Sequence, residues 1–165
     1  MFTSNNTVIA GAMSMGPLLL GSINQARNPL LLFIMFNPSK ANQKEDDPTI
    51  RRVIDFSTRW GFGGVYVGNI FSYISKDPKN IKIANPHFNH KNIKSIIKME
   101  KDSSKTILAW GNNTITPKWI KRVVKDPNYI ELSVNGIPKH PLYLKKKLKY
   151  KRFEFKNADL SDVAI

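Results

Sequence analysis

The chain has 165 residues, 41% of them hydrophobic, which is enough for one globular domain with a real core and excludes a disordered polymer. It contains no cysteine, which excludes disulfides, thiolate nucleophiles and cysteine metal sites and is typical of a cytoplasmic protein. Lysine and arginine number 26 against 12 acidic residues, a formal net charge of +14.

This excess of positive charge favours a polyanionic partner, and DNA over RNA is the expectation. A general bias toward lysine is the alternative, but such a bias alone need not leave the acidic residues so few. No apolar run is long enough to span a bilayer, so no membrane partner is expected. The oligomeric state stays open.

The N-terminal 27 residues carry no acidic side chain and lack the basic start of a signal peptide. They are expected to form strand or loop beside the first buried strand. That strand is predicted at Leu30–Phe36, an apolar run that stops at Asn37-Pro38-Ser39. Ligands of open α/β sheets bind beyond the carboxyl ends of such strands, which would place Asn37 at the binding rim.

A helix is predicted next, because Asp47-Pro48 matches an N-cap followed by a first-turn proline, and Gly61 is a stop after Trp60. A second buried strand, residues 65–68, ends directly before Asn69. Further elements are predicted as a helical turn at Asp77-Pro78, a helix at 89–101, a strand at 106–110, a helix from Thr116-Pro117, a strand at 129–132 and a turn at Asn135-Gly136.

Strands that alternate with helices in this way predict an α/β fold, a three-layer sandwich with a mostly parallel central sheet of about four strands. No repeat or linker interrupts the chain, so residues 1–165 are expected to form a single domain. Its core is predicted over about 28–144, and residues 145–165 are interpreted as a basic C-terminal extension.

Several of these segments resemble the family catalogued as domain of unknown function 1643. The similarity covers roughly residues 30 to 144 and supplies no function. Its segments are residues 34–41, 46–52, 68–71, 109–111 and 138–144.

A more distant likeness is to the uracil-DNA glycosylase superfamily. Asn37-Pro38-Ser39, Asn69, Trp110-Gly111 and His140-Pro141 stand in the order of that superfamily's motifs. The resemblance implies a glycosylase-like fold and a site for a nucleobase. Two features depart from it: Leu142 replaces the usual small residue after the late proline, and residues 46–52 have no assigned counterpart.

Three side chains are the catalytic candidates. The resemblance implies that Asn37 positions a water, although Asn-Pro also simply turns a chain out of a strand. His140 would steady charge that develops on a leaving base, or it is an ordinary loop histidine. Asp46 is a candidate general base, whereas Asp47 already has a role as helix cap.

Other residues are candidates for binding. The base-binding candidates are Phe36, Pro38, Ser39, Asn69, Phe71 and Tyr143. The candidates for the nucleic-acid backbone are Arg51, Arg52, Lys139, Lys145, Lys146, Lys147, Lys149, Lys151 and Arg152. Three aromatic residues, Tyr143, Tyr150 and Phe153, interleave with the C-terminal cations, a pattern that suits stacking and phosphate contacts, although such runs are often just a solvated basic face.

The sequence therefore favours a DNA-binding, glycosylase-like protein that contacts a base lifted from the stack and would cleave its N-glycosidic bond if it is catalytic. No organic cofactor and no metal are expected; His87 and His90 have no supporting ligands nearby. The alternatives are a non-catalytic nucleic-acid binder that senses or shields DNA, and an enzyme acting on a free nucleoside or nucleotide.

Overall fold

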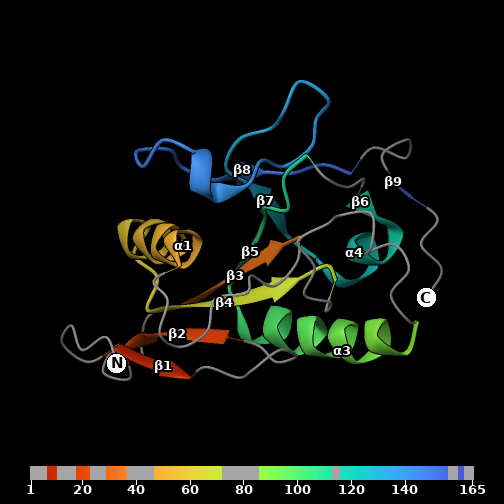
Figure 1. The fold of residues 1–165 in the computed structure, drawn as a ribbon, viewed down its shortest axis with the longest axis horizontal. Coiled ribbons are helices and arrows are strands. Elements are labelled where there is room, and N and C mark those ends of the chain that lie inside the picture. The colour runs from red at the N-terminus through yellow and green to blue at the C-terminus, as the bar shows by residue number, and fades with distance from the viewer. Residues whose placement is uncertain are drawn as a thin grey trace.

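The structure is a computed structural model with three layers, a central sheet and helices on both of its faces (Figure 1). It describes residues 7–10, 18–22, 29–36, 47–71, 86–112, 116–155 and 160–161. The predicted α/β class is confirmed at this level.

The main sheet has seven strands in the order β1-β2-β4-β3-β5-β7-β8. The four central strands β4, β3, β5 and β7 are parallel to their neighbours, and β1, β2 and β8 extend the sheet in antiparallel fashion. Their bounds are β1 Thr7–Ala10, β2 Leu18–Ser22, β3 Leu30–Met35, β4 Gly64–Asn69, β5 Lys105–Leu108, β7 Pro127–Tyr129 and β8 Lys151–Arg152. A separate parallel pair joins β6 Thr116–Pro117 to β9 Leu160–Ser161.

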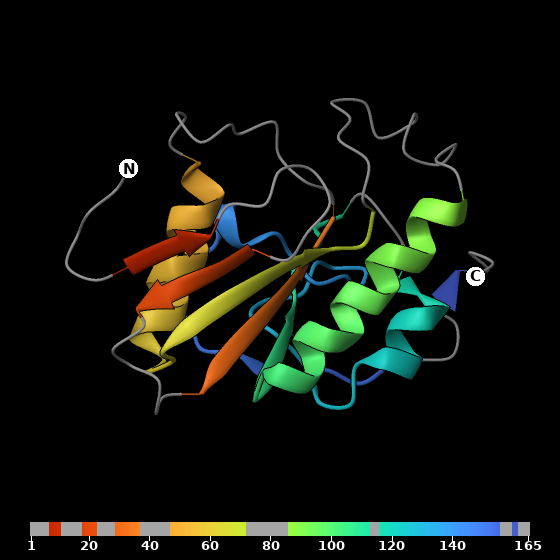
Figure 2. The same cartoon turned by 90° about the horizontal axis from the view of Figure 1, so that it is seen from below.

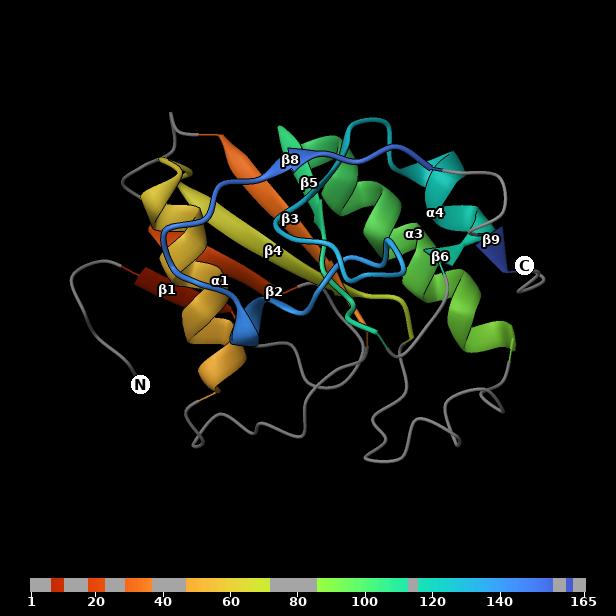
Figure 3. The ribbon, with the colours of Figure 1, turned by 90° about the horizontal axis from the view of Figure 1, so that it is seen from above.

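Strand β3 lies at the centre because it is apolar on both faces. Leu31 and Phe33 belong to a core cluster shared with helix α1, Pro48–Arg59, whereas Leu32 and Ile34 pack on the opposite side. That side is covered by α3, Pro86–Asp102, and α4, Lys118–Val123. Figure 2 shows α3 in front of the sheet from below, and Figure 3 shows α1 in front from above.

Helix α1 begins and ends where the sequence predicts. The Asp47 carboxylate accepts hydrogen bonds from the backbone N–H groups of Thr49 at 2.7 Å and Ile50 at 3.3 Å. Gly61 ends the helix with a φ of +80°, a conformation that residues with a Cβ rarely adopt. The helix packs on the sheet through its buried residues Val53, Phe56 and Ser57.

Trp60 fastens the C-terminal segment to this side of the core. Its Nε1 donates a hydrogen bond to the carbonyl oxygen of Leu148 at 3.1 Å, and its ring meets Tyr150 edge-on at 5.1 Å. Farther along, Phe153 is buried in the core of the opposite face. The core therefore continues past residue 144. Part of the expected basic C-terminal extension, namely β8 and Phe153, belongs to the folded domain.

Three expectations need correction. The sheet has seven strands rather than about four, because β1, β2 and β8 add to the parallel centre. The N-terminal strand β2 pairs with β4 and not with the first buried strand, whose two edges are already bonded to β4 and β5. Strand β7 begins at Pro127 instead of residue 129, and the segment near Leu132 forms only a single bridge with Pro138.

Two further findings concern the helices. The helix predicted at 89–101 runs over Pro86–Asp102, and the turn predicted at Asp77-Pro78 lies outside the described residues. Within the part of the chain that the structure describes, no helix is long and apolar enough to cross a membrane.

A truncation of Phe153 tests whether the C-terminal segment belongs to the core. Phe153→Ala is expected to lower the free energy of unfolding by about 3–5 kcal/mol, because it removes a ring that is 6% exposed. The exposed neighbour is the control: Glu154→Ala should change that free energy by less than about 0.5 kcal/mol. Urea unfolding measures both, and equal, small effects would contradict the packing described.

Candidate functional site

The carboxyl ends of β4, β3 and β5 meet at one edge of the sheet. The chain passes from β3 to its neighbour β4 and then crosses to β5 on the other flank of β3. The connections therefore diverge between β3 and β5, and such a switch point is where open α/β sheets leave a crevice for ligands. This edge is the first place to look for a site.

His140 lies at that switch point. The backbone N–H of Gly111, just past β5, donates to the carbonyl oxygen of Pro138 at 2.9 Å, which fixes the segment that carries His140. Gly111 has a φ of +79°, and a Cβ at this position would lie 3.3 Å from the His140 Cβ. Glycine is therefore required here both by the backbone and by the close approach of the histidine.

The protonation of His140 follows from its contacts. Its Nδ1 accepts a hydrogen bond from the backbone N–H of Leu142 at 3.3 Å, as the cap of the short 3-10 helix η2, Pro141–Tyr143. Burial lowers the pKa of His140, and the negative charge of Asp47 opposes that shift. At neutral pH the ring is thus uncharged, with its proton on Nε2, where it can donate a hydrogen bond.

Asp47 connects His140 to α1. Its carboxylate caps the helix, as described above, and it is near enough to act on the charge of the His140 ring. The same end of α1 packs against η2, so the histidine, the carboxylate and the helix start form one unit. The neighbouring candidate Asp46 lies outside the described residues, as do Asn37, Pro38 and Ser39.

Asn69 shares this edge with His140. It is the last residue of β4 and is paired with Met35 of β3. Val65 and Val67 face the α1 side of the sheet, and strand alternation puts Asn69 on the same face. Strand β3 separates β4 from β5, so Asn69 and the end of β5 stand about 10 Å apart across the sheet.

Asn92 of α3, which the sequence did not single out, supports this end of β4. Its side-chain Nδ2 donates to the carbonyl oxygens of Asn69 at 2.7 Å and Ile70 at 3.1 Å. An asparagine inside a helical pattern gives no signal of such a distant partner, so only the structure reveals it.

The aromatic candidates separate into two groups. Phe36 is 8% exposed and meets Phe71 edge-on at 5.3 Å on the α3 side, which makes Phe36 a core residue and leaves Phe71 half-buried. Tyr143, in contrast, is 85% exposed, and its ring centroid lies 6.1 Å from that of His140. Among the described aromatic candidates, Tyr143 is therefore the one that is exposed beside His140.

A second exposed apolar side chain, missed by the sequence analysis, belongs to the hairpin that precedes His140. Val134 at its tip is fully exposed. The hairpin is closed by the backbone bond from Ser133 N–H to the Ile137 carbonyl oxygen at 2.8 Å and turns at Gly136, whose φ is +76°. The predicted Asn135-Gly136 turn is confirmed, and it presents Val134 to solvent on a stiff support.

The cationic candidates are spread widely. Arg51 is exposed on α1, whereas Arg52 is half-buried and its buried Nη1 has no hydrogen-bond partner within the described part of the chain. Lys139 forms an ion pair with Glu131, which lowers the pKa of that carboxyl group. The exposed cations of the C-terminal segment are Lys145, Lys146, Lys147, Lys149, Lys151 and Arg152.

This segment does not form one patch around His140. Lys145–Lys147 follow η2 directly, but Lys151 and Arg152 belong to β8 at the far edge of the sheet, and Figure 3 shows the chain crossing α1 between them. Two of the interleaved aromatics are also engaged in packing, because Tyr150 packs on Trp60 and Phe153 is buried. Neither ring is available to stack on a base, contrary to the expectation from the sequence.

Among the described residues, no group of three or more histidine, cysteine, aspartate or glutamate side chains could hold a metal ion. The described part of the edge offers instead a neutral histidine donor, a strand-end asparagine and an exposed tyrosine. Such a set can recognise the edge and face of a planar polar ring.

Comparison with known proteins gives a family but no function. A family model described as "Protein of unknown function (DUF1643)" matches residues 19–142. No curated protein and no solved structure matches the chain.

The state of His140 is testable by NMR. Its pKa is expected below the usual 6.5, so the neutral form with the proton on Nε2 should dominate at pH 7. Because the unfolded chain then binds the proton more readily, the His140 contribution to stability is complete above pH 6.5 and declines as the pH falls toward the folded pKa. Asp47→Asn keeps a capping side chain but removes the charge, and it should lower the His140 pKa further. A His140 pKa above 6.5, or one that rises in this variant, would contradict the assignment.

Proposed function

The chain belongs to that family, and we propose that it is a DNA-binding, glycosylase-like protein that contacts a base lifted from the stack at the carboxyl edge of its sheet. The observation that carries the proposal is His140, a neutral donor held against Gly111 at the switch point with an exposed Tyr143 beside it. A nucleobase needs these two kinds of contact, one to its polar edge and one to its face.

The proposal extends to a uracil-DNA glycosylase-like arrangement of the fold. Support comes from three of the four motifs in the resemblance. Asn69 ends β4, Trp110-Gly111 follows β5, and His140-Pro141 begins η2, all at the same edge of the sheet. The fourth motif, Asn37-Pro38-Ser39, follows β3 in the sequence. Strand β3 lies between β4 and β5, the strands that precede the asparagine and glycine motifs.

In a catalytic cycle the bond from the sugar C1′ to the base nitrogen would break through an oxocarbenium-like state, and the bonding electrons would leave with the base. His140 Nε2–H would donate to the negative charge on the departing base, a task for which a neutral imidazole is suited. Asn37 would position the attacking water, Asn69 would bind the base edge, and Tyr143 would stack on the base. Asp46 is the candidate base that would take the proton of the water.

Cations at the start of α1 and after η2 would hold the DNA backbone. Arg51 is in the first turns of α1, which packs against η2, and the lysines at 145–147 come shortly after η2 in the chain. Their contacts with phosphate would release counterions, so the affinity should fall steeply with salt.

A second function, binding without cleavage, is favoured by one observation. The carboxylate described next to His140 is that of Asp47, which already accepts two backbone hydrogen bonds as a helix cap. A protein that only senses or shields a nucleobase at this edge needs no general base stronger than the Asp47 carboxylate.

Cleavage is tested with duplex and single-stranded DNA that carry a panel of modified bases. Abasic product from one of these substrates, with a loss of about 100-fold or more in His140→Ala and Asn37→Ala, is the expected result for a catalytic protein. Lys101→Ala, an exposed change on α3, is the control and should cleave like the parent chain. Salt-dependent binding with no abasic product on any substrate would leave the binding function and overturn the glycosylase.

Tyr143 separates stacking from charge. Tyr143→Ala should weaken binding to DNA roughly 5- to 150-fold, because one base loses its aromatic partner, while the dependence of affinity on salt stays the same. Tyr143→Phe keeps the ring and should bind nearly as well as the parent. Fluorescence anisotropy at several salt concentrations measures both quantities. An alanine variant that binds normally, or a phenylalanine variant as weak as alanine, would argue against stacking.

A further inference from the structure

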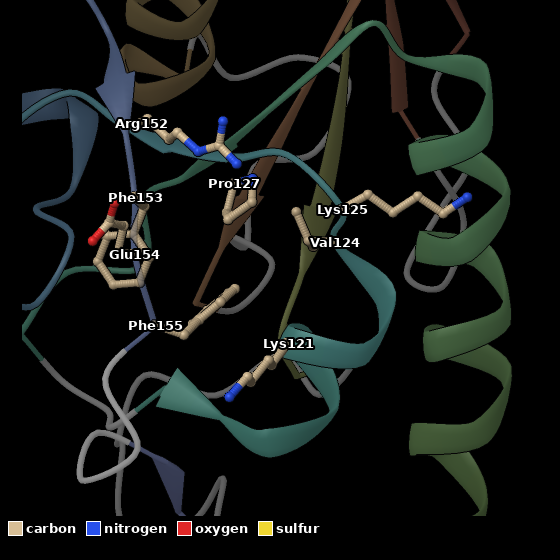
Figure 4. A pocket seen from close by; sticks show the side chains of 8 residues that line it. All are labelled: Lys121, Val124, Lys125, Pro127, Arg152, Phe153, Glu154 and Phe155. Atoms are coloured by element: carbon tan, nitrogen blue, oxygen red, sulfur yellow. The ribbon is translucent and has the colours of Figure 1, made fainter.

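A surface cavity of about 490 Å³ lies among the side chains drawn in Figure 4. Three segments form it: the end of α4, the start of β7, and β8 with the residues after it. The residues that line it are Lys121, Val124, Lys125, Pro127, Arg152, Phe153, Glu154 and Phe155.

The sheet register shows that this cavity is separate from the candidate site. Pro127, in its wall, pairs with Thr106 near the start of β5, whereas Gly111 beside His140 lies five positions beyond Thr106. The two places are thus about 16 Å apart along the strand direction. Val124 and Phe153 also belong to the core cluster on the α3 side, while η2 packs against α1 on the other side.

Part of the cavity wall is apolar. Val124 and Phe153 are 3% and 6% exposed, and the half-buried ring of Phe155 meets Phe153 edge-on at 5.2 Å with an interplanar angle of 78°. Figure 4 shows the Phe155 ring directed toward the space below Pro127. A ring that is anchored at one edge and open along the rest is a surface on which another planar group can pack.

The charged part of the wall is mainly positive, with Lys121, Lys125 and Arg152 against Glu154. Arg152 is held in β8 by its pairing with Asn128, and its side chain crosses above Pro127 in Figure 4, opposite Lys121. Within the described residues the Arg152 guanidinium has no hydrogen bond or ion pair, so its donors are available to a ligand.

We propose that this cavity binds a nucleotide unit, with the phosphate on Arg152 and the base packed on Phe155. A guanidinium is matched to phosphate oxygens, and an aromatic face is matched to a base. The cavity has the volume usual for small-ligand sites. The ligand is a free nucleoside monophosphate or a nucleotide within a single strand; the site does not depend on the function proposed for the His140 edge.

Calorimetric titration tests the chemistry of the site. Thymidine 5′-monophosphate should bind, while thymidine and inorganic phosphate should each bind at least about tenfold more weakly, because each lacks one of the two contacts. Binding of inorganic phosphate as strong as that of the nucleotide would overturn the role of Phe155. The absence of nucleotide and oligonucleotide binding at millimolar concentration would overturn the site.

Variants locate the binding. Arg152→Gln and Phe155→Leu should each reduce nucleotide affinity about tenfold or more, and Phe155→Leu keeps an apolar side chain so that the wall still packs. Lys101→Gln removes an exposed cation of α3 that does not line the cavity and is the matched control for charge. Equal losses in Arg152→Gln and Lys101→Gln would show attraction by net charge alone and would overturn the proposal.

The two sources of the ligand are distinguished by length. A single-stranded oligothymidylate that binds much more tightly than the mononucleotide, with a loss in Arg152→Gln, identifies a strand as the ligand; equal affinities identify the free nucleotide. Both results support the site. This proposal is read from nucleotide affinity in the Arg152 and Phe155 variants, and the glycosylase-like function is read from abasic product in the His140 and Asn37 variants, so failure of one is told apart from failure of the other.

Discussion

The burial of β3 on both faces is the constraint on which the rest of this structure depends. Residues 31–34 are completely buried, and none of them has a polar side chain. Such a strand must be bonded on both edges and covered on both faces. Parallel strands β4 and β5 satisfy its edges, α1 covers one face, and α3 and α4 cover the other. A neighbour on each edge also makes the carboxyl end of β3 the point where the connections diverge, so the candidate site follows from the same burial.

Local signals in the sequence account for much of this core. Asp47-Pro48 and Gly61 predict the limits of α1 because capping and a left-handed stop are short-range effects. The apolar run of β3 is equally local. The partners of the strands are not, since β2 bonds to β4 although β3 lies nearer in the sequence. Strand β8 is only two exposed residues long, and its pairing with β7 leaves no pattern that a reader of the sequence can see.

The candidate site shows the same division. His140 is predicted from its motif, and the hydrogen bond that leaves its proton on Nε2 comes from Leu142, which is two residues away. Its proximity to Gly111 and Asp47 is long-range and emerged only from the fold. The sequence predicts Tyr150 and Phe153 as stacking residues among lysines. In the structure Tyr150 packs against Trp60, and Phe153 is part of the core. Alternating aromatic and basic residues are compatible with a nucleic-acid-binding groove and equally with a segment whose aromatic side chains pack on the core. The two cases have the same spacing in the sequence.

The positive charge of the chain therefore serves more than one place. Some cations adjoin the His140 edge, and others surround a cavity at the far end of the sheet. In the proposed function, the net charge of +14 would attract nucleic acid to the whole surface, while the polar and aromatic groups would decide where a base is held. Recognition by such groups is local, so the position of the contacts on the protein, and not the affinity alone, distinguishes it from attraction by charge.

The most direct measurement is a map of amide chemical-shift changes on adding a DNA duplex with one mispaired base and, separately, the fully paired duplex. A mispaired base leaves the stack at lower cost, so it should reach the site more readily. The mispaired duplex is expected to cause larger chemical-shift changes than the paired duplex at the amides of Asn69, Gly111, His140 and Tyr143. Changes that are the same for both duplexes and confined to the exposed lysines would contradict it.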